Sequence, residues 1–476
     1  MILMNLGRPL TLGAVLALGL AMPTLAAGPG TPAIDGRHLD LSWMLPFVGI
    51  LLSIAVMPLV APYFWHHHFG KVSAAWAALV IVPLAALHGV PTALYEVVHL
   101  LLLDYIPFIV LLTALFTVTG GIHIRGNLHG SPSMNTALLA IGTVLAGWMG
   151  TTGASMLLIR PVIRANDDRR HKIHVFVFFI FLVSNVGGAL TPLGDPPLFL
   201  GFLKGVSFFW TTEYLFSEML LCAIVLLTLF YAVDSYWYRK EGRKKPDPTP
   251  ESPIRIEGGV NIILLAVVVG IVLASGSWKP GVHFTLYHVP LELQHVLRDL
   301  ALIAVIGLSL KLTSRRIRTD NAFTWGPMAE VAKLFAGIFV TIAPALAILR
   351  AGSDGVLAPL VSLVTGPDGQ PLNVWYFWLT GILSSFLDNA PTYLVFFNLA
   401  GGDPELLMGA LASTLAAISC GAVFMGANTY IGNAPNFMVK AVVEEAGIRM
   451  PSFFGYMGWS CAILLPLFVL LTFIFF

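Results

Sequence analysis

The chain has 476 residues, of which 57% are hydrophobic and only 11% are charged, and its formal net charge is +1. Soluble domains carry about 25% charged residues, so the composition excludes a soluble domain and indicates a polytopic membrane protein. The near-neutral charge argues against a nucleic-acid partner. The cysteines have neither metal-ligand nor disulfide spacing, and all three lie in apolar segments: Cys222, Cys420 and Cys461.

The first 27 residues have the features of a secretory signal. Arg8 supplies a basic start, residues 10–22 are apolar, and residues 24–27 are small enough for cleavage. We therefore predict a signal peptide over 1–27, with an uncleaved first span as the alternative.

Ten further segments are apolar over about 20 residues, the length that crosses a bilayer as a helix. They fall near 42–61, 72–89, 95–122, 174–207, 213–233, 258–275, 298–313, 326–349, 404–446 and 453–475. The fourth and the ninth are too long for one straight crossing.

These two long segments contain helix breakers in their middle. Residues 184–199 hold three glycines and three prolines, and residues 426–437 repeat the pattern 238 positions later. Proline removes a backbone donor and ends a helix, and a broken helix at membrane depth is typical of a transporter's ion site. Asp195 of the first stretch aligns with Asn433 of the second, which keeps the shape and removes the charge.

Two other apolar stretches, 132–163 and 373–400, have a polar break in the middle, at 150–155 and 387–392. Each half of such a stretch is short for a crossing, so both are predicted to be re-entrant hairpins. Non-helical backbone at that depth is tolerated only where protein or a cavity surrounds it.

The placement of charge predicts the orientation. Most of the 26 Lys and Arg fall in loops on one side when the mature N-terminus lies outside, as the positive-inside rule requires for a bacterial-type inner membrane. The fold class is then an all-α polytopic membrane protein with two inverted-topology repeats, each with one hairpin and one broken helix. The predicted repeats are 28–233 and 258–476, joined by a cytoplasmic linker at 234–257.

Each repeat predicts one ion site, made from a hairpin tip and the broken helix of the same half. The first site comprises Thr151, Thr152, Ser155, Asn185, Thr191 and Asp195. The second comprises Asp388, Asn389, Thr392, Asn428, Thr429 and Asn433. Hydroxyl, amide and carboxylate oxygens are hard ligands that suit sodium.

Asp195 and Asp388 are the carboxylates at these predicted sites. A carboxylate shielded from water can exchange a proton for sodium, and we assign both as sodium ligands on this basis. The alternative is that each only caps the helix that follows it. Lys333, deep in a predicted span, is either a charge partner for such a site or a lysine that extends to the inner surface.

No phosphate-loop pattern, zinc-protease pattern or nucleophile turn appears in the chain. We therefore expect neither an enzyme nor direct drive by ATP, and no cofactor beyond the transported or coupling ions.

The Thr-Pro-Leu-Gly-Asp-Pro run at 191–196 and the Asn-Thr-Tyr-Ile-Gly-Asn-Ala-Pro-Asn run at 428–436 resemble the ion transporter superfamily. The resemblance covers nearly the whole mature chain and is strongest to its sodium/proton antiporter and arsenite permease branch, and also to its citrate transporters. It implies a homodimer in which a mobile part carries the site across the membrane. The dicarboxylate branch has Ser-Asn-Thr at both hairpin tips; Thr151-Thr152-Gly153 and Asp388-Asn389-Ala390 depart from that pattern.

The function predicted from these observations is sodium/proton antiport by alternating access, with sodium and protons competing at the midplane carboxylates. The alternative is a sodium- or proton-coupled transporter of citrate or another organic anion.

Overall fold

The structure is a computed structural model that describes residues 34–242, 252–367 and 369–476. The predicted signal peptide at 1–27 lies outside the described residues. The described chain is mostly helical, with two small antiparallel sheets. β1 (His123–Arg125) pairs with β2 (Arg255–Glu257), and β3 (His283–Leu286) pairs with β4 (Val289–Glu292).

Eight helices in the described ranges are long and apolar enough to cross a membrane. They comprise η2 and α2 (Leu41–Met44 and Leu45–Val60), α3 (Pro62–His88), α4, η3 and α5 in one run (Val90–Leu100, Leu101–Tyr105 and Ile106–Thr119), α10 (Trp210–Glu241), α11 (Val260–Ser277), α12 (Leu293–Leu312), α14 (Gly326–Arg350) and α21 (Phe453–Phe475). They coincide with eight of the ten predicted crossings, which confirms the prediction of a helical multi-pass membrane protein.

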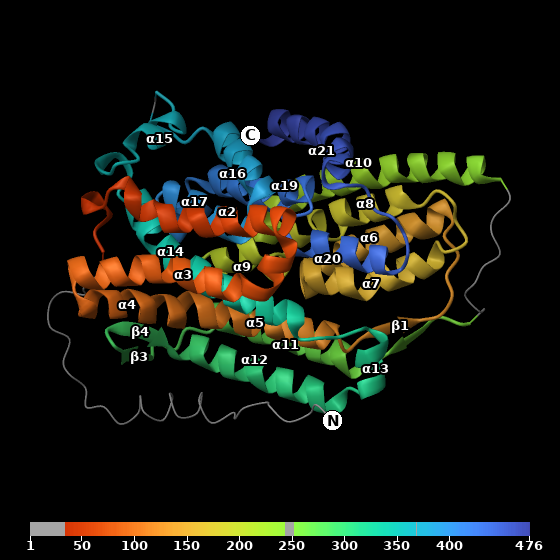
Figure 1. Cartoon of the computed structure of the whole chain (residues 1–476), viewed down its shortest axis with the longest axis horizontal. Coiled ribbons are helices and arrows are strands. Elements are labelled where there is room, and N and C mark those ends of the chain that lie inside the picture. Colours follow the sequence, from red (N-terminus) through yellow and green to blue (C-terminus); the bar gives the residue numbers. More distant parts are fainter. Residues whose placement is uncertain (1–33, 243–251, 368) are drawn as a thin grey trace.

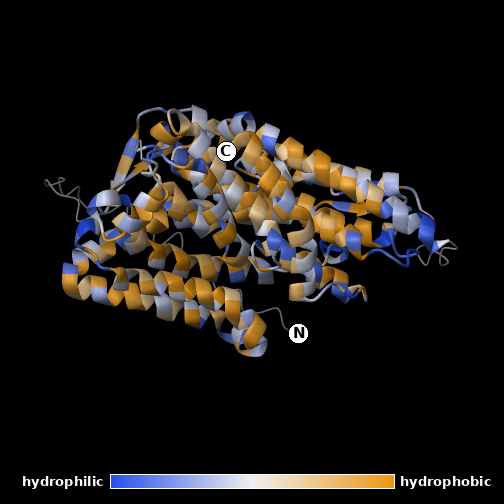
Figure 2. Ribbon diagram, turned by 90° about the horizontal axis from the view of Figure 1, so that it is seen from above, coloured by the Kyte–Doolittle hydropathy of each residue, from blue (hydrophilic) through white to orange (hydrophobic). Residues whose placement is uncertain are grey.

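The surface of these helices is apolar along their length. Figure 2 shows hydrophobic residues along the middle of the helices and hydrophilic ones gathered toward the two ends of the molecule. Large side chains such as Val82, Ile263 and Phe473 are more than half exposed. Such a surface is suited to lipid, because hydrocarbon tolerates apolar side chains while the helices satisfy their own backbone groups.

The other two predicted crossings are interrupted helices. The first consists of α8 (Ile173–Leu182), η4 (Val186–Ala189) and α9 (Pro196–Leu203). The second consists of α19 (Ala412–Met425), η6 (Gly426–Asn428) and α20 (Ala434–Glu445). Proline stands at the start of α9 and α20, where its missing donor costs nothing.

The two predicted hairpins are helix pairs. They are α6 (Pro132–Met149) with α7 (Thr151–Ala165), and α16 (Asn373–Phe386) with α17 (Asn389–Leu399). Gly150 joins the first pair with a φ of 83°, a conformation that favours glycine. At 1.5 Å per residue, α7 and α17 extend about 22 and 16 Å, less than the roughly 30 Å of a hydrocarbon core.

Local contacts at the two interruptions recur 238 positions apart. The hydroxyl of Thr191 donates to the carbonyl of Gly147, and that of Thr429 donates to the carbonyl of Ser385, 238 positions later in both partners. In each half a glycine (Gly194 or Gly432) packs on the carbonyl of another glycine six residues earlier, where a Cβ would collide. The 238-residue match in sequence therefore reflects equivalent backbone packing.

The halves also exchange contacts. α9 of the first half packs against α17 of the second, and α20 of the second packs against α7 of the first. Figure 1 shows α6, α7, α8 and α20 lying together on one side of this junction and α16, α17 and α19 on the other. The starts of α7, α9, α17 and α20 are brought together in this way.

The predicted linker at 234–257 is more ordered at its ends than its charge suggests. α10 continues to Glu241, and Arg255–Glu257 forms β2. Asp234 and Glu241 are buried because they form ion pairs with the buried Arg169, so these two charges do not mark a solvated loop. The remaining short helices are η1 (Gly36–His38), α13 (Arg315–Asp320), η5 (Gly352–Asp354), α15 (Ala358–Leu363) and α18 (Pro404–Met408).

Candidate functional site

Four short helices begin around one buried carboxylate. α7 begins at Thr151 and α17 at Asn389, while Asp195 and Asn433 are the residues directly before α9 and α20. Thr151 and Asn389 are 238 positions apart, as are Asp195 and Asn433. Thr151 and Asn389 therefore occupy equivalent positions, at the starts of α7 and α17.

Asp195 is the centre of this arrangement and is only 1% exposed. Its Oδ1 accepts a hydrogen bond from the Thr151 hydroxyl at 2.8 Å and one from the Asn433 amide at 3.1 Å. Its Oδ2 accepts one from the Asn389 amide. The first half thus supplies the carboxylate and a hydroxyl, and the second half supplies two amides.

The charge of Asp195 has no ionic partner among the described residues. Within residues 34–242, 252–367 and 369–476, its side-chain hydrogen bonds come from neutral groups, and no Lys, Arg or His forms an ion pair with it. Buried charges are normally paired or bind a metal ion. The N-termini of the surrounding short helices offset part of the negative charge, since each carries a partial positive charge.

An oxygen atom beside the carboxylate also lacks a donor. Oδ1 of Asn389 is buried and has no hydrogen-bond partner among the described residues, although Asn389 Nδ2 reaches Asp195. A buried acceptor without a donor costs about 1–3 kcal/mol. A hard cation bound between Asp195 and Asn389 would satisfy both oxygens, since amide and carboxylate oxygens are its preferred ligands.

A layer of amides supports the carboxylate from the two loops. Asn185 Nδ2 donates to Asn436 Oδ1 at 2.7 Å, and Asn433 Nδ2 also lies 3.2 Å from Asn185 Oδ1. Asn436 Nδ2 in turn donates to the carbonyls of Gly426 and Thr429. Asn436 was not among the predicted site residues, although the Asn-Ala-Pro-Asn run at 433–436 could have indicated it.

Other predicted site residues lie in the same region but form their hydrogen bonds with residues other than Asp195. Ser155 pairs with Ser184, a residue that the prediction missed, with 2.8 Å between their hydroxyls. Thr191 and Thr429 hold the loops to the hairpin tips, as described above. Asn428 donates to Ser385 Oγ at 2.9 Å, and Thr152 is half-buried beside Thr151.

Asp388 is placed differently from the expectation. It is the residue before α17, half-buried, and its Oδ1 accepts a hydrogen bond from the Ala390 N–H at 3.0 Å. Its carbonyl accepts a hydrogen bond from Thr392. The break at 426–433 contacts Ser385 instead, so the two predicted sites are not separate: Asn389 and Asn433 of the second join Asp195 of the first.

Lys333 does not reach this cluster. Its side chain is exposed, and its ammonium group lies 5.4 Å from the centre of the Phe69 ring of α3. The expectation that it extends to the surface fits this position, whereas the role of a charge partner for Asp195 does not.

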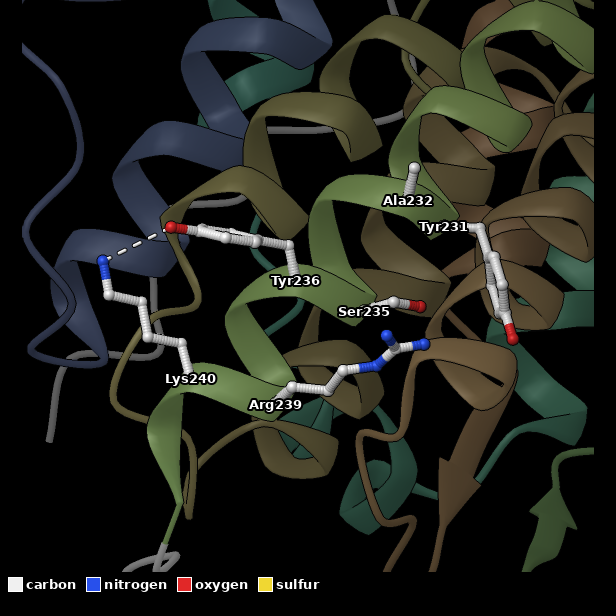
Figure 3. A pocket seen from close by; sticks show the side chains of 6 residues that line it. All are labelled: Tyr231, Ala232, Ser235, Tyr236, Arg239 and Lys240. Atoms are coloured by element: carbon white, nitrogen blue, oxygen red, sulfur yellow. Dashed lines mark hydrogen bonds between the residues drawn. The ribbon is translucent and has the colours of Figure 1, made fainter.

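A separate hollow of about 580 Å³ lies on the surface of α10. Figure 3 shows its lining, in which the Lys240 ammonium group is hydrogen-bonded to the Tyr236 hydroxyl at 3.5 Å. None of its lining residues belongs to the predicted site, and one helix supplies them all. The carboxylate cluster is therefore the stronger candidate for the functional site.

Comparison with known proteins agrees with a transport role. A sequence model of a family described as "putative citrate transport" matches residues 36–476. The chain belongs to this family. It is also 25% identical over 432 residues to the Na(+)/H(+) antiporter NhaD of Halomonas elongata, covering 82% of both chains. Uncharacterized transporters from Mycobacterium bovis and Mycobacterium tuberculosis are 25% identical over 386 residues, covering 78% of this chain and 84% of theirs.

Proposed function

We propose that this membrane transporter exchanges sodium for protons, and that Asp195 is the group for which the two ions compete. The observation that carries the proposal is a carboxylate, 1% exposed, that is surrounded by neutral donors and has no cation of its own among the described residues. Similarity to the antiporter of Halomonas elongata supports the same choice.

The ligand set favours sodium over a softer metal. Three hard oxygen ligands from different parts of the chain meet here: the Asp195 carboxylate, the Thr151 hydroxyl and the Asn389 amide oxygen, which has no hydrogen-bond donor. Within the described ranges there is no group of three His, Cys, Asp or Glu side chains that could hold a metal ion. Rotation of the Asn389 and Asn433 side-chain amides would turn their oxygens toward a bound ion in place of their N–H groups.

The mechanism completes the proposal. The halves would cross the inner membrane in opposite senses, with α6/α7 and α16/α17 as re-entrant hairpins and the mature N-terminus outside. Alternating access would expose Asp195 to one side and then to the other. A homodimer is what the resemblance to the superfamily implies.

A coupled citrate or organic-anion transporter is the second candidate. The four helix starts around Asp195 favour it, because helix N-termini attract anions, and so does the family description. Asp195 itself already supplies one negative charge at this point, and no arginine or lysine of the described chain pairs with it, so a polyanion would meet repulsion there.

Everted membrane vesicles with a pH-sensitive dye test the first candidate. Addition of sodium should dissipate the proton gradient in vesicles with the native protein and should fail to do so with Asp195→Asn, because an amide cannot release a proton. Full exchange by Asp195→Asn would refute the role of this carboxylate. Uptake of labelled citrate that depends on sodium or on a proton gradient, without a dye response to sodium alone, would favour the second candidate.

A further inference from the structure

A second polar region lies beside the C-terminal ends of α9 and α17, two of the four helices that begin at the site. A cavity of about 540 Å³ is lined by α4, η3 and the C-terminal end of α14, together with Lys204 and residues 34–37. Its ionisable lining includes Glu96, His99, Asp104, Lys204 and Arg350.

Two of the charged residues that line this cavity, Asp35 and Arg37, neutralise each other. Arg37 and Asp35 form an exposed ion pair of 2.7 Å, and the hydrogen bonds from Arg37 lower the pKa of Asp35 to about 2. The charges of Asp35 and Arg37 therefore cancel, and the net charge of the cavity depends on its other ionisable residues.

The ion pair between Asp104 and Lys204 is the tightest contact in that interior. Lys204 Nζ lies 2.6 Å from Asp104 Oδ1, with side-chain exposures of 18% and 4%. Asp104 lies in η3, a short stretch of π-helix between α4 and α5. π-helical turns are rare and often occur at functional positions.

Lys204 is also the residue that directly follows α9, and Asp195 is the residue that directly precedes it. α9 has eight residues, so about 12 Å of helix separates the ion pair from the site. The end of α17 reaches the same region, since Arg350 of the cavity donates to Asn398 at 2.7 Å. Both short helices that present Asp195 and Asn389 to the site therefore end beside this cavity.

We propose that the Asp104–Lys204 ion pair is a latch that holds α9 in the position where Asp195 is shielded from this cavity. Lys204 is then a positioning residue, because it acts on Asp195 through α9 and does not contact the ion. Release of the pair lets α9 move away from η3 and opens a route from the cavity to Asp195. The proposal depends on the proposed function only for the identity of the ion that uses this route.

Accessibility of α9 tests the latch without any transported ion. Leu200, in the middle of α9, is 1% exposed, so Leu200→Cys in a Cys461→Ser background places a buried thiol between the latch and the site. We expect a membrane-impermeant thiol reagent to label it slowly. Lys204→Met should raise the labelling rate about fivefold or more, the change that loss of a pair worth about 1 kcal/mol produces.

Controls separate the latch from a general loss of stability. The charge exchange Asp104→Lys with Lys204→Asp should return the labelling rate to within about twofold of the parent, since a pair across the cavity is restored. Lys440→Met, which breaks the 2.7 Å pair with Glu444 on α20, should leave the rate unchanged. Hydrogen exchange of the amides of 198–204 in otherwise native protein gives a second measurement and should accelerate in Lys204→Met.

Labelling and hydrogen exchange that are as slow in Lys204→Met as in the parent would overturn the latch. Neither measurement uses sodium or a pH gradient, so absence of sodium/proton exchange in vesicles would leave the latch standing and refute only the proposed function.

Discussion

Asp195 and Asp234 are both buried aspartates in the same membrane protein, but they are compensated in opposite ways. Asp234 is 0% exposed, and its Oδ1 lies 2.8 Å from Arg169 and 2.8 Å from His174, while Asn135 donates to Oδ2. Arg169 also pairs with Glu241 at 2.7 Å. Asp195 is 1% exposed, and among the described residues its carboxylate receives side-chain hydrogen bonds from the neutral groups of Thr151, Asn389 and Asn433 alone.

The difference marks Asp234 as a structural charge and is the basis on which we propose a functional role for Asp195. Around Asp234 the protein supplies the countercharge, so the cluster ties the end of α10 to the chain between α7 and α8 and has no need of an external ion. Around Asp195 no such countercharge is found among the described residues, and we propose that a proton or a sodium ion supplies it. Mutations that remove the partners of each aspartate test this distinction.

The largest effect on stability is expected from Arg169→Met. Removing one partner of a buried ion pair costs about 3–5 kcal/mol because the other charge stays buried and unpaired, and here Asp234 and Glu241 both lose Arg169. Asp195→Asn should change the free energy of unfolding by less than about 1 kcal/mol, since its neighbours are neutral and can rebond. Thermal unfolding in detergent compares the two variants at one scan rate. Equal losses of stability would make Asp195 a structural residue like Asp234.

Asn389→Ala should weaken sodium binding without unfolding the protein. The variant removes one donor to Asp195 and the amide oxygen that has no donor of its own. We expect the sodium concentration for half-maximal exchange to rise about tenfold, equivalent to about 1.4 kcal/mol of lost binding. Asn398→Ala, on the same helix but at its far end, is the matched control. A shift of the same size in the control would attribute the effect to α17 as a whole.

Asp388→Asn should have a smaller effect. Asparagine caps a helix as well as aspartate does, so the hydrogen bond to Ala390 can be kept while the charge is lost. We expect a change of about two- to threefold in the sodium dependence, the size of a weak interaction between charges that do not touch. Complete loss of exchange in vesicles would restore Asp388 as a direct sodium ligand, as the sequence suggested.

Lys333→Met should leave exchange unchanged, because the exposed Lys333 side chain lies over the Phe69 ring and does not reach the site. The initial rate of the dye response measures this directly. Loss of exchange in Lys333→Met at normal protein levels would mean that Lys333 reaches the site in another conformation.

The long helices and the two interruptions could be predicted from the sequence, because local rules determine them. The eight long apolar segments correspond to the eight long helices of the structure. The glycines and prolines in 184–199 and 426–437 predicted both interruptions, because these residues restrict or free their own backbone. The convergence of Asn389 and Asn433 on Asp195 could not be predicted in this way. It depends on α9 and α20 crossing to the other half, a tertiary arrangement with no local signal.

The surroundings of two charged regions could not be predicted from the sequence either. Composition marked 234–257 as a solvated linker, yet Asp234 and Glu241 are buried by Arg169 from a different part of the chain. Asp388 had the same residue type and predicted depth as Asp195, but the structure gives it a backbone partner from its own helix. Residue type alone could not tell which carboxylate lies at the centre.

Proton release on sodium binding measures the competition of the two ions at Asp195. Purified protein in weakly buffered detergent solution near neutral pH is mixed with sodium chloride, with choline chloride as the ionic control, and the pH of the medium is recorded. We predict that the native protein releases protons on sodium binding, up to about one per site, and that Asp195→Asn releases none. Equal proton release by Asp195→Asn, or sodium binding to the native protein with no proton release at any pH, would contradict competition at this carboxylate.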